Sequence, residues 1–195
     1  MNNLHRIFIA INLPEKLRNE LGLFQDRWPG LPARWTKTES LHITLNFLGN
    51  ANDEEVCEIC KNAAEIAIRH EPFDLTIDKV AYGPVENLSK KPPKMIWAVG
   101  DSSSELGALQ KDLETSLYEF CGGEYRESEI YSFAPHITLA RLQLAGLAQM
   151  EQEEIPEINE KISRTFMVES IEIMESQLRK GGPVYTILES LKLGE

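Results

Sequence analysis

One tetrapeptide, His-Ile-Thr-Leu, occurs twice in this chain of 195 residues, at His42–Leu45 and at His136–Leu139. Each half of the chain carries one copy, and both copies lie in apolar runs that are typical of strands. Side chains alternate between the two faces of a strand. In each copy the histidine and threonine therefore share one face, while the isoleucine and leucine share the other. The sequence thus predicts two strands that each bury an apolar row and present a histidine beside a threonine hydroxyl.

The alternation can be followed along both motif strands, which we expect over residues 41–48 and 135–141. It predicts that Thr44 and Asn46 lie on the face of His42. It also predicts that Thr138 lies on the face of His136. The buried face of the first strand is then expected to hold Leu41, Ile43, Leu45 and Phe47.

A single His-x-Thr on a strand is more often an ordinary solvated face than a functional site. Here two of the four histidines lie in the two copies, in the same predicted strand context, and this favours a functional interpretation. The other two, His5 and His70, have no such setting, and we assign them no role. Histidine has an ordinary pKa near 6.5, so one ring can be protonated while its twin is neutral. Two histidines that face one cleft can therefore supply an acid and a base, and the threonine hydroxyls beside them can donate hydrogen bonds to a ligand.

Segments on both sides of the motifs resemble one known family, the two-histidine (2H) phosphoesterases. Within that family the chain is most similar to the bacterial and archaeal RNA 2′,3′-cyclic phosphodiesterases, historically called 2′-5′ RNA ligases. The resemblance extends over nearly the whole chain. The segments that carry it are Arg6–Ala10, Leu41–Gly49, Pro135–Arg141, Ser176–Leu178 and Gly182–Tyr185.

The resemblance implies an α+β fold of two lobes, each an antiparallel sheet with helices outside, with a cleft between them. We expect one domain over residues 1–195. The implied activity is hydrolysis of the 2′,3′-cyclic phosphate at an RNA end to a 2′-phosphate, with 2′-5′ ligation as the reverse reaction. His42 would be the acid on the 3′-oxygen and His136 the base on water. The residues by themselves leave these two roles open.

Arg141 and Tyr185 are further candidates for substrate binding, beside Thr44 and Thr138. The resemblance makes Arg141 a phosphate contact, but strict alternation puts it on the face opposite His136. A bulge or the strand end must therefore turn it inward. Tyr185 lies next to a predicted turn, as does Trp35, and either could stack on a base. Three other aromatic residues are expected in the core, since aromatic residues in strands usually pack there; they are Phe8, Phe47 and Trp97.

The formal net charge of −11 argues against a protein that holds long nucleic acid, because such binding depends on neutralising phosphates with a basic surface. A short ligand held by a few local cations is compatible with it. We therefore expect RNA ends, short oligonucleotides or cyclic nucleotides as partners, bound by a monomer. The candidate cations are Arg141, Arg6, the loop Lys90–Lys94, and Arg179 with Lys180.

Cofactors and metals are not expected. Cys57 and Cys60 form a Cys-x-x-Cys, but they lie in a predicted helix without a second pair, and a structural zinc site needs about four ligands. Core packing is the better interpretation for these two and for Cys121. No stretch approaches the roughly 20 apolar residues of a membrane span. Residues Met1–Arg6 lack the features of a signal peptide, so we expect a cytoplasmic location.

Turn and capping residues divide the rest of the chain. We expect a helix near residues 14–26, a second from an Asn52 or Asp53 cap to His70, and a third from the Ser102–Ser104 cap to Cys121. Residues before Arg164 are expected to be irregular or short-helical. The remaining strands are expected at 6–13, 73–80, 95–99, 165–175 and 183–191, the last two forming a hairpin around Gly181–Gly182.

Three alternatives to an RNA-end hydrolase stay open. One is a phosphodiesterase for a small cyclic nucleotide such as ADP-ribose cyclic phosphate, since substrate size depends on loops such as 83–94. A second is a nucleotide-binding module without turnover, although a pure binder needs no matched acid and base. The third, a metal-dependent nuclease, is disfavoured because no His/Asp/Glu cluster has metal-ligand spacing. Turnover of a dinucleotide with a cyclic end would separate the enzyme from the binding module.

Overall fold

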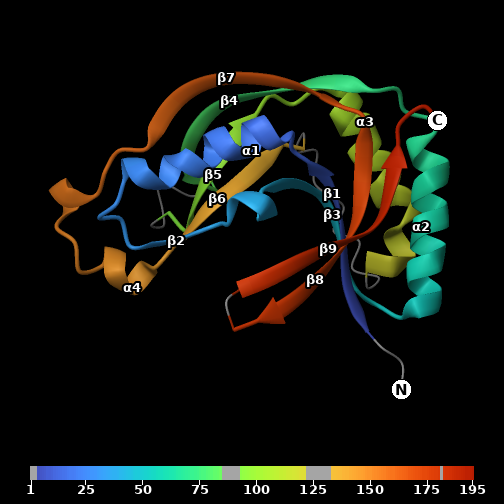
Figure 1. The fold of residues 1–195 in the computed structure, drawn as a ribbon, viewed down its shortest axis with the longest axis horizontal. Helices are drawn as coiled ribbons and strands as arrows, with labels where there is room; N and C mark the ends of the chain where they lie inside the picture. The colour runs from blue at the N-terminus through green and yellow to red at the C-terminus, as the bar shows by residue number, and fades with distance from the viewer. Residues whose placement is uncertain (1–3, 85–92, 122–132, 181) are drawn as a thin grey trace.

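One antiparallel sheet of nine strands runs through the protein and positions both motifs. The structure is a computed structural model, and it describes residues 4–84, 93–121, 133–180 and 182–195 (Figure 1). The strands are β1 (His5–Asn12), β2 (Ala33–Trp35), β3 (His42–Ala51), β4 (Phe73–Gly83), β5 (Met95–Gly100), β6 (His136–Leu142), β7 (Asn159–Val168), β8 (Ser170–Arg179) and β9 (Gly182–Lys192).

In the part of the chain that the structure describes, two helices exceed eight residues and the others are shorter. The α-helices are α1 (Glu15–Gly22), α2 (Asp53–Ala67), α3 (Ser104–Ser116) and α4 (Leu144–Leu147). Single turns of 3₁₀-helix lie at η1 (Leu23–Arg27), η2 (Thr38–Ser40), η4 (Tyr118–Cys121) and η5 (Gln152–Glu154).

The sheet consists of two four-stranded halves, and the motif strands meet at its centre. The strand order is β7-β4-β5-β6-β3-β1-β8-β9, with the short β2 paired to β6. Among the described residues, a single residue pair joins the halves, Ile43 on β3 opposite Ile137 on β6. These two isoleucines directly follow the two motif histidines. The expected α+β architecture with two antiparallel lobes is therefore confirmed, and the lobes are halves of one continuous sheet.

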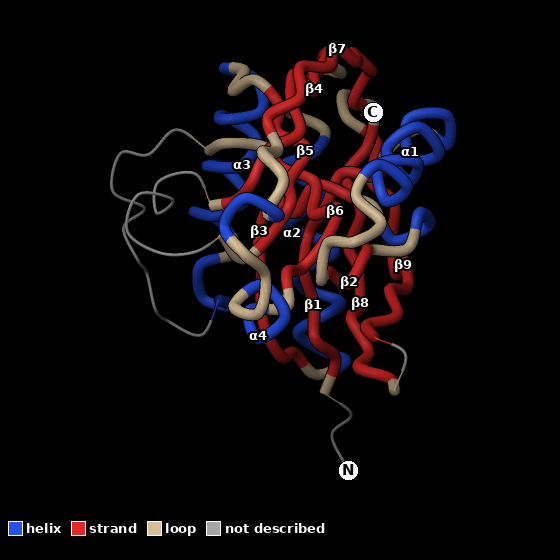
Figure 2. Tube along the Cα trace, turned by 90° about the vertical axis from the view of Figure 1, so that its left-hand side faces the viewer, coloured by secondary structure: helices blue, strands red, loops and turns tan. Residues whose placement is uncertain are grey.

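Aliphatic side chains between the sheet and the helices form the core. Helices α2 and α3 pack against each other, and α2 also contacts β1, β3, β8 and β9. Ile59 of α2, Leu109 of α3 and Ile9 of β1 are all fully buried there. Each such side chain contributes about 1.5–3 kcal/mol relative to exposure. Figure 2 shows α3 and α1 on opposite sides of the strands.

The N-termini of the two long helices have the caps that the sequence predicts. The Asn52 side chain accepts hydrogen bonds from the backbone N–H groups of Glu54 and Glu55, and the Glu55 carboxylate accepts one from the Asn52 N–H. This capping box satisfies amides that have no partner within the helix. At the start of α3, the Ser103 hydroxyl accepts from the Leu106 N–H. Both helices end before the expected residue, α2 at Ala67 and α3 at Ser116, and α1 ends at Gly22.

The single strand expected over 165–175 is wrong, and the irregular or short-helical stretch expected before Arg164 is confirmed only as far as Ile158, with α4 and η5 in it. The chain forms β7 from Asn159 and a separate strand, β8, from Ser170. Strand β7 pairs with β4 at one edge of the sheet, whereas β8 pairs with β1 in the other half. Most side chains of β7 are exposed or half-buried, so its sequence has no apolar row that would reveal a strand. The expected closing hairpin is confirmed as β8–β9.

Candidate active site

The central pair of the sheet brings the two motifs side by side. With Ile43 opposite Ile137, the antiparallel register carries His42 toward Thr138 and Thr44 toward His136. The two isoleucines are fully buried, whereas the two histidines and two threonines are half-buried. The four polar side chains therefore lie together on the face of the sheet that is turned away from α2 and α3.

The two histidine rings are held by the same kind of hydrogen bond. His42 Nδ1 lies 2.8 Å from the carbonyl oxygen of Ser40, and His136 Nδ1 lies 3.2 Å from that of Ala134. In each case the acceptor is two residues before the histidine. A carbonyl oxygen can only accept, so Nδ1 carries the hydrogen and donates it. This leaves Nε2 of each ring free to take up or release a proton.

Aromatic side chains cover both rings. The ring of His42 lies 5.1 Å from that of Phe8 and 5.0 Å from that of Tyr185, between centroids. The ring of His136 stacks on Trp97 at 4.0 Å. Phe8 is on β1 and Trp97 on β5, so each aromatic residue comes from the strand beside its motif strand. Packing therefore fixes the plane of each imidazole in addition to the hydrogen bond at Nδ1.

Burial lowers the pKa of both histidines below the ordinary 6.5. The hydrogen bonds to the Ser40 and Ala134 carbonyls oppose this shift, because they favour the protonated ring. The pKa of His42 is lowered further by the charge of His136. A proton on one ring therefore disfavours a proton on the other. This coupling suits a site that needs one protonated and one neutral histidine.

Each motif strand contains an extra residue at the same place, and β3 contains a second one at Leu48. On β6, Thr138 pairs with Trp97 and Ala140 with Ile96, so Leu139 is unmatched. On β3, Thr44 pairs with Ala10 and Asn46 with Ile9, so Leu45 is unmatched. Such bulges interrupt the alternation of side chains beyond them.

The bulge at Leu45 overturns two expectations for β3. Asn46 was expected beside His42, but it pairs with the core residue Ile9 and is only 8% exposed. Phe47 was expected in the core, but it pairs with Phe8 on the site face and is 69% exposed. The rings of Phe47 and Phe8 are 6.1 Å apart.

The bulge at Leu139 places Arg141 on the same face as His136, whereas strict alternation would place it on the opposite face. Arg141 pairs with Met95, and Met95 shares a strand face with Trp97, which stacks on His136. Arg141 is the fifth residue after His136, as Phe47 is the fifth after His42. The two halves of the site therefore present different side chains, one cationic and one aromatic, from equivalent backbone positions.

Tyr185 links the two halves electrostatically. It lies on β9, and its ring packs against Phe8 at 5.3 Å as well as against His42. Burial raises the pKa of its hydroxyl, and the positive charges of Arg141 and Arg6 act in the opposite direction. Both guanidinium groups therefore lie within electrostatic reach of Tyr185. The hydroxyl keeps its proton at neutral pH and can donate a hydrogen bond.

Comparisons with known proteins agree with this geometry. Residues 11–94, which include the first motif, match the family model of the LigT-like phosphoesterases. Two curated RNA 2′,3′-cyclic phosphodiesterases match nearly end to end. The Methanocaldococcus jannaschii protein is 24% identical over 94% of this chain and 98% of its own length. The Methanothermobacter thermautotrophicus protein is 26% identical over 96% and 98%. The crystal structure of TT0787 from Thermus thermophilus superposes with a TM-score of 0.79 at 27% identity, covering 97% of this chain and 98% of that one. The chain is therefore similar to the LigT-like phosphoesterases over residues 11–94 and to RNA 2′,3′-cyclic phosphodiesterases over nearly its whole length.

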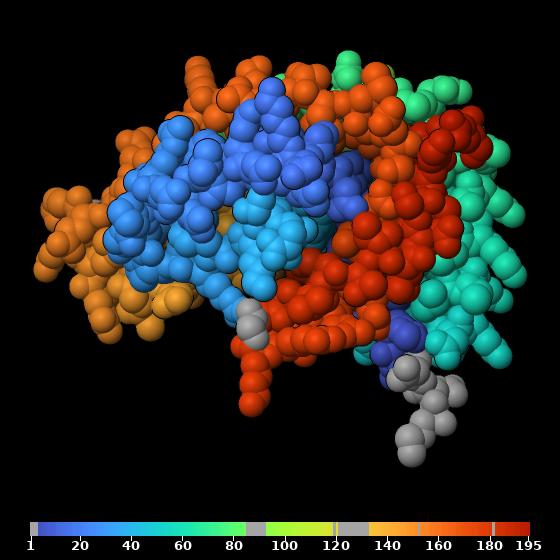
Figure 3. All heavy atoms as spheres, in the orientation of Figure 1, coloured from blue at the N-terminus to red at the C-terminus, as the bar shows by residue number. Residues whose placement is uncertain are grey.

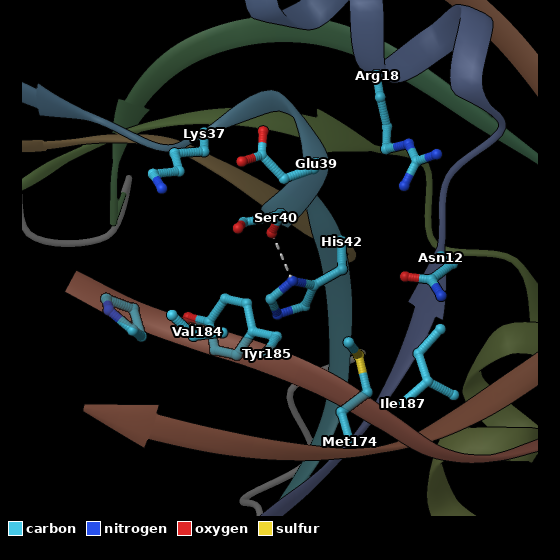
Figure 4. A pocket seen from close by; sticks show the side chains of 11 residues that line it. Asn12, Arg18, Lys37, Glu39, Ser40, His42, Met174, Val184, Tyr185 and Ile187 are labelled. Carbon is cyan, nitrogen blue, oxygen red and sulfur yellow. Dashed lines mark hydrogen bonds between the residues drawn. The ribbon is translucent and has the colours of Figure 1, made fainter. Parts of the chain in front are cut away.

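The protein has a pocket of about 190 Å³ beside His42. Figure 4 shows His42 at its centre, with Arg18 and Asn12 to one side and Lys37 and Glu39 above. Its apolar wall comes from Met174, Tyr185 and Ile187 of the β8–β9 hairpin, together with Pro183 and Val184. His136, Thr138 and Arg141 lie outside its lining. In Figure 3 the N-terminal segments and the β8–β9 hairpin meet on this face.

Other cations lie around the site, and the sequence indicated only some of them. Arg6 and Arg141 act on Tyr185, as noted, and Arg34 lies opposite Arg141 in the β2–β6 ladder. No pattern in the sequence selects Arg34, because nothing in it predicts the short strand β2. Arg179 donates to the side chain of Gln177 in the hairpin. Of the candidate loop, residues 90–92 lie outside the described residues.

Cys57 and Cys60 differ in burial. Cys60 packs against the core, and burial raises the pKa of its thiol, whereas Cys57 is exposed, so core packing is wrong for Cys57. The side chain of Cys121 lies outside the described part of the chain. The described residues contain no group of three or more His, Cys, Asp or Glu placed to hold a metal ion. Within the same residues, no helix is long and apolar enough to cross a membrane.

Proposed function

We propose that this chain hydrolyses the 2′,3′-cyclic phosphate at RNA ends and leaves a 2′-phosphate. The observation that carries the proposal is the matched pair of imidazoles. Each donates Nδ1–H to a carbonyl two residues earlier and keeps Nε2 free, and the two rings are coupled electrostatically. The names of the curated relatives, RNA 2′,3′-cyclic phosphodiesterase, support the same reaction.

In this mechanism the two rings exchange protons with the reacting atoms. His136 is the base: its neutral Nε2 takes a proton from a water molecule as the water oxygen bonds to phosphorus. His42 is the acid: its protonated Nε2 gives a proton to the 3′-oxygen as the bond between phosphorus and that oxygen breaks. Each transfer contributes about 10²–10⁴ in rate. The two rings end with exchanged protonation states, and solvent restores them.

Threonine and arginine side chains supply the electrostatic part of the mechanism. Negative charge grows on the non-bridging phosphate oxygens as water attacks, and fixed donors are most effective there. Thr44 and Thr138 lie beside the histidines and donate hydroxyl hydrogen bonds to these oxygens. Arg141 reaches the same group from the site face of β6, and its planar guanidinium can bind two oxygens at once.

Aromatic side chains bind the nucleoside part of the substrate. Phe47 offers an exposed ring on the site face of β3, and a base can stack on such a ring with little regard to its identity. Tyr185 keeps its hydroxyl proton and can donate to the ribose or phosphate.

One chain supplies every one of these groups, so we propose that the protein acts as a monomer and a single domain. With a net charge of −11, it is suited to RNA ends rather than to long nucleic acid. With a 5′-hydroxyl in place of water as the nucleophile, the same opening of the cyclic phosphate joins two ends by a 2′-5′ linkage.

Hydrolysis of an RNA oligomer with a 2′,3′-cyclic phosphate end tests the proposal. Wild type is compared with His42→Ala and His136→Ala in EDTA, and the product is resolved as 2′- or 3′-phosphate. His70→Gln is the matched control, since His70 is bonded to Asp112 away from the motif strands. We expect turnover to a 2′-phosphate in wild type and in the control, and its loss in both motif variants.

Three other outcomes would contradict the proposal. Tight binding of the RNA without turnover by wild type would indicate a binding module. A requirement for a divalent metal would indicate a different mechanism. Turnover of adenosine 2′,3′-cyclic phosphate or ADP-ribose cyclic phosphate in the absence of any turnover of RNA would indicate a small-nucleotide enzyme.

A further inference from the structure

The pocket beside His42 contains positive charge that the proposed chemistry does not use. Arg18 of α1 and Lys37 just before η2 line it, with Glu39 on the same rim. No ion pair is described for either cation, in contrast to Arg27 and Arg164, which pair with glutamates. Two cations against one carboxylate leave this rim net positive on a strongly acidic protein. Such a rim favours an anionic group.

The pocket and the exposed Phe47 ring lie at opposite ends of the same stretch of chain. Lys37, Glu39 and Ser40 precede His42, whereas Phe47 follows it by five residues. Strand residues advance by about 3.3 Å each. A nucleotide whose phosphorus lies at the histidines can therefore reach Phe47 in one direction and the pocket in the other.

The connectivity of a nucleotide decides which of its groups enters the pocket. This step rests on the proposed function, in which His42 protonates the 3′-oxygen. In ribose, C3′ is bonded to C4′, which carries C5′, whereas the base is on C1′, next to C2′. The 5′ substituent is therefore on the side of the 3′-oxygen, and so on the side of His42. The base is on the side of the 2′-oxygen.

We propose that Arg18 and Lys37 bind the phosphate on the 5′-oxygen of the terminal nucleotide, which in RNA is the last phosphodiester before the cyclic end. Figure 4 shows the two cations on different sides of the pocket above His42, with the β8–β9 side chains below. At about 190 Å³ the pocket is smaller than sites for drug-sized ligands, which start at about 300 Å³. It therefore suits a phosphate and part of the adjoining sugar, and the rest of the RNA leaves over the rim. The subsite lets the enzyme prefer an RNA end to a free cyclic nucleoside.

Three substrates that differ only at the 5′-oxygen test the subsite. They are adenosine 2′,3′-cyclic phosphate, its 5′-phosphorylated form, and the dinucleotide ApA with a cyclic end. We expect wild type to have a kcat/KM at least about tenfold higher for the last two, since charge-assisted contacts to phosphate are strong. Arg18→Gln and Lys37→Gln should each lower kcat/KM for those two by about five- to tenfold. Both variants should leave kcat/KM for the 5′-hydroxyl substrate unchanged, which also shows that they are folded.

Two further variants control for charge. Lys16→Gln removes one positive charge from the same helix outside the pocket, and it should change none of the three values. Glu39→Gln removes the opposing carboxylate, and it should raise kcat/KM for the phosphorylated substrates by about twofold.

The outcomes that would overturn the subsite differ from those that would overturn the activity. Equal kcat/KM for all three substrates in wild type, or equal losses on all three in Arg18→Gln, would overturn the subsite alone. A preference for the 5′-monophosphate without one for ApA would show that the pocket takes a small nucleotide and not RNA. If wild type hydrolyses none of the three substrates, the subsite is tested by measuring the affinities for adenosine 2′,5′-bisphosphate and 2′-AMP by calorimetry. Equal affinities would overturn the subsite, and a preference for the bisphosphate that Arg18→Gln abolishes would support it.

Discussion

Phe47 offers the sharpest test of how the substrate lies in the site. The side chain is 69% exposed although it is a large aromatic residue on a strand. A phenylalanine presents about 200 Å² of surface, so about 140 Å² of this one is in contact with water. A base lying flat on one ring face would cover roughly half of that. At about 25 cal/mol per Å² this is worth about 1.7 kcal/mol, within the range of about 1–3 kcal/mol for a base stacked on an aromatic side chain.

Phe47→Ala should therefore lower kcat/KM for adenosine 2′,3′-cyclic phosphate by about 20-fold, since every 1.4 kcal/mol is a factor of ten. The loss should appear mostly in KM, because the stack forms equally in the ground state and the transition state. Phe47→Trp should retain or improve KM. Met167→Ala is the matched control, because Met167 is an apolar side chain on β7 that is 55% exposed. Steady-state rates of phosphate-ester hydrolysis provide the assay.

A substrate without a base makes the test decisive. Wild type and Phe47→Ala should hydrolyse 1-O-methylribose 2′,3′-cyclic phosphate with the same kcat/KM, because there is no ring to stack. An equal loss on this substrate would refute the reasoning. Phe47 would then act through its contact with Phe8, whose ring packs against His42. An unchanged KM for the adenosine substrate would mean that the base lies elsewhere.

The remaining predictions concern the acid and base, the arginine and the two ion pairs of His5. Because burial lowers the pKa of both His42 and His136, the free enzyme holds both rings neutral at high pH; kcat/KM should peak below pH 6.5 and fall about tenfold per pH unit above it, as a pH–rate profile would show. Arg141→Ala should lower kcat by about 10²–10³ with unchanged thermal stability, and Arg141→Lys should restore only part of it, since an ammonium cannot bind two oxygens; a full restoration would argue against a two-oxygen contact. Two carboxylates raise the pKa of His5, so its stabilisation is fully present below pH 6.5 and is lost as pH rises through the raised value. His5→Gln should therefore lower the melting temperature by about 1–3 °C at pH 5.5 and by less at pH 8.5, whereas an equal loss at both values would exclude the ion pairs as the cause.

Strand alternation was a sound guide only as far as the first bulge. It placed His42, Thr44, His136 and Thr138 on one face because each motif is regular over its first three residues. It failed at Asn46 and Phe47 because Leu45 is an extra residue in the pairing of β3 with β1. No local sequence pattern predicts this bulge. The position of Arg141 was the available signal. An arginine at the fifth place after one histidine required a bulge, and the same spacing in the other motif leads to Phe47.

Long-range pairing also explains the errors in the fold. The capping residues of α2 and α3 are local, so the starts of both helices could be predicted from the sequence. Strand β7 is polar along most of its length and forms only because β4 offers a partner. Arg18 and Lys37 were not selected because α1 and the approach to η2 meet at His42 only in the folded chain. Such convergence of separate segments cannot be deduced from spacing.

The equal bulges have a consequence for the direction of catalysis. As far as the first bulge, both motif strands offer an equivalent backbone, with the same hydrogen bond at Nδ1 and an extra residue at the same place, so this part of the sheet does not distinguish the acid side from the base side. The two sides differ in the fifth residue after each histidine, which is Phe47 on β3 and Arg141 on β6. This difference sets which way round a nucleotide binds. Exchanging them, as Phe47→Arg with Arg141→Phe, should turn a bound nucleotide end for end on an unchanged scaffold. A crystal structure of that double variant with 2′-AMP would then have the adenine over position 141.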